Sequence, residues 1–255
     1  MPEIDVSWML EIVETAGKLA LSHFGKTKGT LKPDESWVTQ ADLDVEKYLR
    51  SQISRVRPDD AILGEEGENP QPESPIVWAI DPVDGTRAFN LGFPIWGVSV
   101  GVLKLGVPTL GAFILPAIGD IYHTDGKTSF HNGVRLEPPR TQISSNAVLM
   151  VSEGAHSQLS INYGGKIFSL GSAAAHLCYV ARGSAIGAFD QASIWDYAAS
   201  AAILQVLGVP FRYLSGEAVD FSALYSGLPV AEPTLVCPIE NFDTIRDATT
   251  YHNEN

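Results

Sequence analysis

The sequence predicts a mixed α/β fold, and three patterns along its 255 residues support this. Apolar residues recur at helical spacing through most of the first 55 positions. Short alternating segments with glycine-containing turns then fill residues 96–131, which is typical of an antiparallel meander. After residue 145, alanine-rich helical segments alternate with short apolar strands. We therefore expect an N-terminal α+β half (residues 1–145) and a C-terminal α/β half (residues 146–255) in one compact unit.

The N-terminal half begins with two predicted helices. Residues 5–24 have an amphipathic pattern, and Gly25 is expected to end this helix. A polar loop or short hairpin over residues 26–37 leads to a second helix, which opens at residues 38–42 and runs to about Arg55.

The remaining elements of the first half are predicted strands. The segment before Gly64-Glu65-Glu66 is a short strand, and the next one is buried. The two longest strands are expected to pair, and the last two form a hairpin. In chain order these strands are 61–63, 76–80, 96–105, 108–115, 118–123 and 128–131.

The second half is predicted to alternate strands with helices. The helix at residues 195–207 is apolar almost all round, so it should be buried. Residues after Ile239 form a polar tail or a last helix. The other predicted elements are strands 147–152, 185–189, 209–214 and 233–236 and a helix at 171–182.

Charge and composition exclude several classes of function. The formal net charge is −13 and no Lys/Arg cluster stands out, which argues against binding to a nucleic-acid backbone. Cys178 and Cys237 lie in apolar surroundings and are expected to be free, buried thiols. The six histidines are scattered without zinc-ligand spacing, and no EF-hand loop is present. The acidic N-terminus lacks a signal pattern and no long apolar run occurs, so we expect a cytoplasmic protein without a membrane span.

One motif carries most of the chemical information. An apolar strand runs directly into two aspartates, a glycine and a threonine. Pro82 holds Asp81 extended, and a turn at Val83 lets its carbonyl face a cation. Gly85 permits close backbone approach to a ligand, and Thr86 can cap a helix whose first amides face a phosphate. The alternative is an ordinary strand-to-helix turn. The motif is Trp78-Ala79-Ile80-Asp81-Pro82-Val83-Asp84-Gly85-Thr86.

Further carboxylates suggest a metal site. Glu65 and Glu66 follow a predicted strand, and Asp196 lies in an otherwise apolar segment. Carboxylate oxygens gathered at the ends of buried elements hold magnesium against a phosphate, which indicates a metal-dependent phosphatase. A solvated loop is the preferred interpretation of Glu66. A helix-terminal role is the alternative for Asp42 and Asp196.

The motifs, taken in order, resemble those of the inositol monophosphatase family. Residues 81–86 resemble its Asp-Pro-(Ile/Val/Leu)-Asp-Gly-Thr signature. Residues 38–42 resemble its Val-Thr-x-x-Asp and residues 64–66 its Gly-Glu-Glu. Residues 171–173 resemble its Gly-(Ser/Thr)-Ala, and residues 195–199 its Trp-Asp-x-Ala-Ala. The matches run from about residue 10 to 210, and motifs in this order are far more specific than any one alone.

The resemblance implies a fold, a metal set and a reaction. The fold is the layered αβαβα sandwich of the sugar-phosphatase type, with the site between the two halves, and family members are often homodimers. Two or three Mg²⁺ ions are implied, with ligands Glu65, Asp81, the Val83 carbonyl, Asp84 and Asp196. The implied catalytic residues are Asp42, Thr86 and Glu65. Thr86, hydrogen-bonded to Asp42, is implied to orient a water and help accept its proton, and Glu65 holds the metal. The implied substrate-binding residues are Asp84, Gly85, Thr86, Gly171, Ser172, Ala173, Asp190 and Asp196.

Three departures from the family pattern bear on the substrate. Arg87-Ala88 replaces the usual Thr-Asn and is similar to some histidinol-phosphate phosphatases. Asp190 stands for a glutamate and lies one residue closer to Asp196, and Ser200 replaces a glycine. The leading substrate is a small polyol phosphate such as inositol 1-phosphate. Histidinol phosphate (the phosphate of an amino alcohol), fructose 1,6-bisphosphate and 3′-phosphoadenosine nucleotides are alternatives.

Two other classes of protein match parts of the sequence. A non-catalytic regulator that binds a polyol or a cation has no need of Asp42 and Thr86 beside intact metal ligands, so their presence favours catalysis. Residues 97–101 fit the GxSxG pattern of serine hydrolases. They lie within a predicted strand with no following helix, whereas a nucleophile elbow requires a strand, a turn and a helix.

Overall fold

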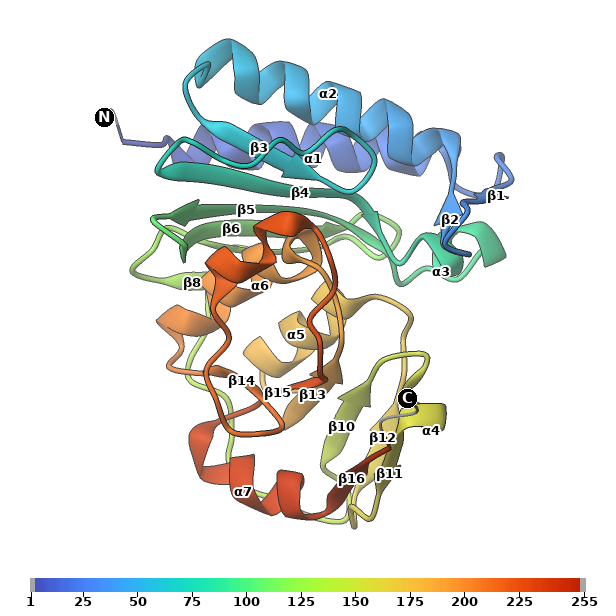
Figure 1. The fold of residues 1–255 in the computed structure, drawn as a ribbon, viewed down its shortest axis with the longest axis vertical. Helices are drawn as coiled ribbons and strands as arrows, with labels where there is room; N and C mark the ends of the chain where they lie inside the picture. The colour runs from blue at the N-terminus through green and yellow to red at the C-terminus, as the bar shows by residue number, and fades with distance from the viewer. Residues whose placement is uncertain (1–2, 253–255) are drawn as a thin grey trace.

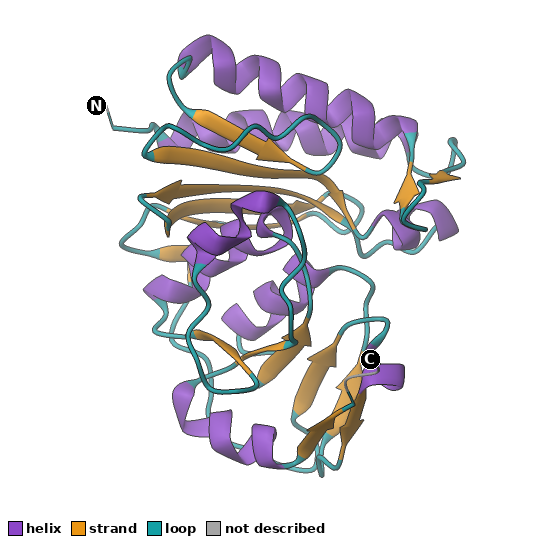
Figure 2. Cartoon of the chain, viewed as in Figure 1, coloured by secondary structure: helices purple, strands orange, loops and turns teal. Residues whose placement is uncertain are grey.

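The protein is described by a computed structural model that covers residues 3–252. Its elements stack in five layers (Figure 1). Two helices, α1 and α2, cover a seven-stranded sheet, helices α5 and α6 separate it from a five-stranded sheet, and α7 covers the far side (Figures 1 and 2). The predicted α/β class and αβαβα order are confirmed.

Both predicted N-terminal helices are present. Helix α1 spans Val6–His23, and Asp5 caps it by accepting a hydrogen bond from the Ser7 amide at 2.8 Å. Helix α2 spans Gln40–Val56. Their apolar faces pack on the outer face of the large sheet, because both stripes would otherwise face water. Between them, β1 (Thr30–Leu31) and β2 (Trp37–Val38) form an antiparallel hairpin, one of the two predicted forms of this segment.

The large sheet has the order β3-β4-β5-β6-β7-β8-β9. Only the β3–β4 pair among these strands is parallel, so the predicted antiparallel meander is confirmed. Strand β4 runs on past the predicted end at residue 80, and a register shift between Asp81 and Asp84 marks an irregularity there. The strands are β3 (Ala61–Gly64), β4 (Ile76–Asp84), β5 (Gly97–Lys104), β6 (Val107–Leu115), β7 (Asp120–Thr124), β8 (Ser129–His131) and β9 (Val134–Arg135).

Helix α6 (Ile194–Val206) lies against the inner face of the large sheet. Two glycines of the sheet allow this close approach. A Cβ added to Gly111 would lie 2.3 Å from the Ala199 carbonyl oxygen, and one added to Gly101 would lie 2.5 Å from Ala198. Most of α6 is buried, as its apolar sequence predicts, and its N-terminus is thereby held beside the end of β4.

The small sheet has the order β12-β10-β13-β15-β14, with helix α5 above it. Several short elements were not predicted. Strands β11 and β16 pair although they lie about 90 residues apart, so no local pattern announces them. The predicted elements are β10 (Val148–Val151), α5 (Ala173–Ala181), β13 (Gly187–Asp190), β14 (Phe211–Tyr213), β15 (Thr234–Val236) and α7 (Ile239–Asp247). Helix α3 (Thr86–Leu91) is the helix expected after the turn at the end of β4. The additional elements are α4 (Ala155–Gln158), β11 (Leu159–Ile161), β12 (Lys166–Phe168), the 3₁₀ helix η1 (Phe221–Ser226) and β16 (Thr249–Tyr251).

Two further expectations are settled by the fold. Cys178 and Cys237 are both free and buried. Ser99 of the GxSxG pattern lies within β5, and its hydroxyl donates to the Trp195 carbonyl, so this serine is no nucleophile elbow. Within residues 3–252, none of the helices combines the length and apolar character needed to cross a membrane.

Candidate functional site

A cavity of about 390 Å³ opens where the end of β4 meets the N-termini of α3, α5 and α6. Nearly all of the predicted site residues line it. They are Glu65, Asp81, Val83, Asp84, Gly85, Thr86, Gly171, Ser172, Ala173, Asp190 and Asp196. Asp42 lies behind this wall and reaches it through Thr86. The fold thus brings together residues that lie as far as 154 positions apart in the chain (Asp42 and Asp196).

The turn after β4 depends on Gly85. Its φ of +88° is left-handed, and a Cβ there would lie 2.7 Å from the Gly171 carbonyl oxygen. Only glycine meets both conditions without strain or a clash. Gly85, and not Thr86, is the N-cap of the short helix α3, which corrects the expected capping role of Thr86. This close contact seats residues 171–173 directly across from the β4 turn.

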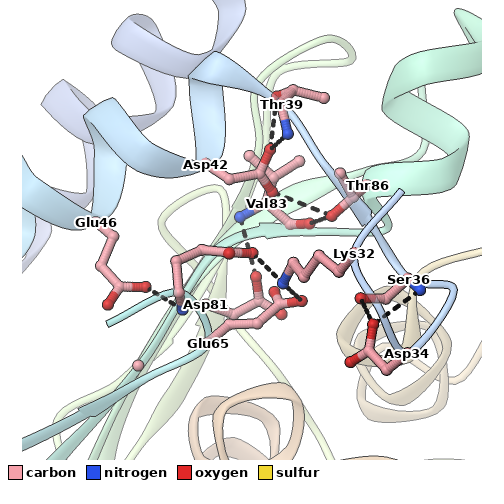
Figure 3. A network of polar contacts seen from close by, with 12 residues as sticks. Lys32, Asp34, Ser36, Thr39, Asp42, Glu46, Glu65, Asp81, Val83 and Thr86 are labelled. Atoms are coloured by element: carbon pink, nitrogen blue, oxygen red, sulfur yellow. Dashed lines mark hydrogen bonds and ion pairs between the residues drawn. The ribbon is translucent and has the colours of Figure 1, made fainter. Parts of the chain in front are cut away.

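The Thr86 hydroxyl is free for another task and lies between two oxygens (Figure 3). It is 3.1 Å from Asp42 Oδ1 and 2.9 Å from the Val83 carbonyl oxygen. Asp42 Oδ2 accepts hydrogen bonds from the Thr39 amide at 2.8 Å and the Thr39 hydroxyl at 2.5 Å. Asp42 is therefore part of the α2 capping box and a partner of Thr86 at once, because each role uses a different oxygen.

Carboxylates gather in two groups at the cavity floor. One oxygen from each of Asp81, Asp84 and Asp196 lies within 4.8 Å of the others. The same holds for Asp42, Glu65 and Glu66. Oxygen donors of this kind suit a hard cation such as Mg²⁺, and no soft sulfur or nitrogen donor belongs to either group. The residues present therefore fit the metal that the sequence implies.

The carboxylates of these two groups repel one another when they are ionised. Burial raises the pKa of Glu65 to about 8, of Asp196 to about 7 and of Asp84 to about 6, and neighbouring carboxylates add to each shift. Burial and the same neighbours raise the pKa of Asp81 well above its ordinary value. A cluster that holds protons near neutral pH is one in which a bound cation would replace them.

Lys32 is a cation that sequence reasoning missed. Its Nζ points toward Glu65 (Figure 3) and lies 3.4 Å from Glu65 Oε1 and 2.5 Å from Glu66 Oε1. The expected solvated position of Glu66 is wrong, because its side chain is largely buried. The backbone amide of Glu66 also donates a hydrogen bond to Glu46 Oε2 at 2.8 Å. Residue type alone could not reveal Lys32, since only the folding of the β1–β2 hairpin over the cavity edge brings it to the glutamates.

Asp84 belongs to the group of Asp81, Asp84 and Asp196 and is also hydrogen-bonded to the start of helix α5. Its carboxylate accepts hydrogen bonds from the Ser172 hydroxyl and from the amides of Ala173 (3.1 Å) and Ala174 (2.9 Å). These are amides that the first turn of a helix leaves without partners. Asp196 similarly accepts from the Ser193 amide at 2.7 Å at the start of α6. The helix-terminal role weighed for Asp196 is real, and the carboxylate still lies in the cluster.

The far wall of the cavity contains further side chains that sequence reasoning missed. Glu153, His176 and Gln191 line it beside the predicted Asp190. Arg87 lines the mouth, and its Nε lies 3.2 Å from Glu153 Oε2. Ser200, by contrast, is buried between α5 and α6 and does not line the cavity.

Comparison with known proteins identifies the family. The profile of the inositol monophosphatase family matches residues 6–240. The chain belongs to this family. A histidinol-phosphatase of Chlorobaculum parvum is 33% identical over 253 residues, covering 93% of this chain and 97% of the relative. An inositol-1-monophosphatase of Rhizobium meliloti is 29% identical over 251 residues, covering 91% of each.

Solved structures agree with this fold. The extragenic suppressor protein SuhB of Bartonella henselae superposes with a TM-score of 0.83 at 23% identity, covering 95% of this chain and 97% of that one. As a member of the inositol monophosphatase family, the present protein is a phosphoric monoester hydrolase. The family is Mg²⁺-dependent in general.

Proposed function

We propose that this protein is a Mg²⁺-dependent phosphomonoesterase that hydrolyses the phosphate ester of a small polyol or amino alcohol by direct attack of water. The observation that carries this proposal is the Asp42–Thr86 contact beside the two carboxylate groups. A protein that only bound a cation would need the carboxylates, and would not need a threonine hydroxyl hydrogen-bonded to one of them.

The carboxylates supply two sets of metal ligands. We assign Glu65, Asp81 and the Val83 carbonyl to one Mg²⁺, and Asp81, Asp84 and Asp196 to a second, with a weaker third ion near Glu65. Bound there, Mg²⁺ would lower the pKa of water and offset the charge of the phosphate. Asp81 is shared in this assignment, in keeping with its place in the Asp81, Asp84 and Asp196 group and its full burial.

The chain's own groups handle the proton of the attacking water. The Thr86 hydroxyl shares its one proton between two acceptors, Asp42 Oδ1 at 3.1 Å and the Val83 carbonyl at 2.9 Å, so its lone pairs remain able to accept a hydrogen bond from water. Burial raises the pKa of Asp42, although the bonds from Thr39 and Thr86 lower it, so this carboxylate is a better proton acceptor than a solvated one. The Gly85 and Thr86 amides at the turn are the groups we assign to the phosphate oxygens.

The far wall favours an alcohol with hydrogen-bond donors. Asp190 and Glu153 place two carboxylates where the alcohol would leave, and only hydroxyl or ammonium groups pair well with them. We propose an amino alcohol phosphate of the histidinol phosphate type as first candidate, because its ammonium group would pair with the carboxylates of this wall. The Chlorobaculum parvum relative supports this choice.

A polyol phosphate such as inositol 1-phosphate is the second candidate. Asp190 stands where the family resemblance places the polyol-binding carboxylate, and the Rhizobium meliloti relative is an inositol-1-monophosphatase. We also expect a homodimer, as the resemblance implies, and a cytoplasmic location.

The test is phosphate release with Mg²⁺ from histidinol phosphate, inositol 1-phosphate, fructose 1,6-bisphosphate and 3′-phosphoadenosine 5′-phosphate. Excess EDTA is the control. We expect one of the first two to be cleaved fastest and EDTA to stop all release. No release from any substrate in Mg²⁺ would contradict the proposal and favour a binding protein.

A further inference from the structure

His176 is a buried side chain in the cavity wall to which the proposed reaction assigns no role. It lies on the first turns of α5, is 1% exposed and sits between the loop before that helix and Asp190. The other histidines of the sequence do not line this cavity. A buried imidazole among charged groups has to satisfy both ring nitrogens, so its partners show what it holds in place.

The two nitrogens have different partners. The Leu170 amide donates to Nε2 at 2.9 Å. Nε2 is therefore unprotonated, and the ring proton is on Nδ1. Nδ1 lies 3.1 Å from Asp190 Oδ2 and 3.3 Å from Oδ1, so it donates to the carboxylate. Burial lowers the pKa of His176, but the Asp190 charge and hydrogen bond raise it, so the pKa lies above its ordinary value overall. A second ring proton on Nε2 would nevertheless face the Leu170 N–H, and this contact opposes protonation of the ring.

Asp190 needs such a partner. It is 3% exposed at the end of β13, where burial raises its pKa and His176 lowers it. Its backbone carbonyl is held separately, by the Thr234 hydroxyl at 3.0 Å. The carboxylate faces the cavity, and a donor on one side sets its orientation while leaving other lone pairs for a ligand.

We propose that His176 is a positioning residue for substrate recognition. Its Nδ1–H aims the Asp190 carboxylate at the alcohol part of the substrate, and its Nε2 ties the loop that carries Gly171 and Ser172 to the same helix. This inference rests on the proposed contact between Asp190 and the alcohol. The two contacts connect segments about 20 residues apart, 170–172 and 190, through one side chain.

Two variants separate the two contacts. In His176→Asn the amide nitrogen takes the place of Nδ1 and keeps the bond to Asp190. In His176→Gln the amide oxygen takes the place of Nε2 and keeps only the bond from Leu170. Kinetics are measured with the better of histidinol phosphate and inositol 1-phosphate, and with p-nitrophenyl phosphate, whose leaving group has no donor for Asp190.

We expect His176→Gln to raise KM for the natural-type substrate about tenfold with kcat within about twofold, because a lost bond to a charged group weakens ground state and transition state equally. KM for p-nitrophenyl phosphate should be unchanged, and His176→Asn should stay close to the unaltered protein. Equal effects of the two variants, equal effects on both substrates, or no effect of His176→Gln would overturn the inference.

Asp190→Asn distinguishes this failure from failure of the proposed function. If that change leaves KM for both natural-type substrates unaltered, Asp190 does not contact the alcohol and the proposed substrate site is wrong. If Asp190→Asn raises KM and His176→Gln does not, only the role of His176 is wrong.

A measurement on the unaltered protein needs no variant to fold. Long-range ¹H–¹⁵N correlation spectra distinguish the two neutral imidazole tautomers. We expect one of the six histidines to be neutral with its proton on Nδ1. The absence of any such histidine would overturn the inference.

Discussion

Mg²⁺ binding should release protons from this protein. Without Mg²⁺ the free energy of unfolding should fall as the pH rises, and bound Mg²⁺ should prevent this fall. The cause is the buried carboxylate cluster, in which the pKa values of Glu65, Asp196 and Asp84 are raised to about 8, 7 and 6. Unfolded, these groups lose their protons near their ordinary values. Folded, they keep them to higher pH unless a cation takes their place.

The size follows from linkage. Between about pH 4 and pH 8 the folded protein binds more protons than the unfolded chain, so the free energy of unfolding falls as the pH rises. The pKa of Asp84 rises from 3.8 to about 6 on folding. At roughly 1.4 kcal/mol per pKa unit, Asp84 alone lowers the free energy of unfolding by about 3 kcal/mol as the pH rises through this range. At pH 6.5 Glu65, Asp196 and Asp84 together hold roughly two protons that a cation would displace, and at pH 9 they hold fewer.

Calorimetric titration with MgCl₂ in buffers of different ionisation enthalpy counts the released protons. Thermal unfolding from pH 5.5 to 8.5 reports stability in EDTA and in Mg²⁺. We expect Tm in EDTA to fall as the pH rises and Mg²⁺ to flatten this dependence. Asp81→Asn should reduce both effects, whereas Asp44→Asn, a change on the partly exposed side of α2, should reduce neither.

Two results would refute this reasoning. Mg²⁺ binding without proton release at pH 6.5 would mean that the carboxylates are already ionised. A Tm in EDTA that rises with pH over the same range would mean that their folded pKa values are not raised.

Three other predictions concern catalysis, the β4 turn and assembly. Asp42→Asn should lower kcat about 10²- to 10⁴-fold, the usual contribution of a proton acceptor, with Mg²⁺ affinity nearly unchanged in calorimetry. Gly85→Ala should lower the free energy of unfolding by more than the roughly 1–2 kcal/mol expected for an alanine in a left-handed conformation, because the new methyl group would lie 2.7 Å from the Gly171 carbonyl oxygen. The same variant should have no activity. Light scattering coupled to gel filtration should give twice the chain mass of 27.5 kDa.

Each of these predictions has a comparison built into the chain. Asp44→Asn lies on the same helix as Asp42 and should keep full activity, and an Asp42→Asn variant within about fivefold of the original would contradict the assigned role. Gly92→Ala has the same backbone strain at φ +82° but open space around it, so equal losses of stability and activity in the two alanine variants would show that the Gly171 contact is unimportant. A mass near 27.5 kDa would contradict the dimer.

Local sequence patterns predicted the elements that bury one continuous apolar face. Helices α1 and α6 were predicted because their apolar spacing is set within the helix itself, and the meander because each strand alternates. Strand β4 was predicted too short, since Asp81 and Asp84 interrupt the apolar run while their backbone continues in the sheet. Strands β11 and β16 were missed because a pairing across about 90 residues has no local signal.

The candidate site divides in the same way. Its motif residues could be named in advance, because metal chemistry restricts them to a few oxygen-bearing types at turns. The contacts of Lys32, Glu153 and His176 could not, since each depends on how distant segments pack.

By itself the sequence determined the fold class, the family and the carboxylates of the metal-type site, since these are written in spacing and residue type. Only the tertiary structure decided that Asp42 meets Thr86, that Lys32 faces Glu65 and that His176 holds Asp190. The physical reason is that the rotation and depth of each helix against the sheets follow from the packing of the whole core, and contacts at the ångström scale appear only once that packing is set.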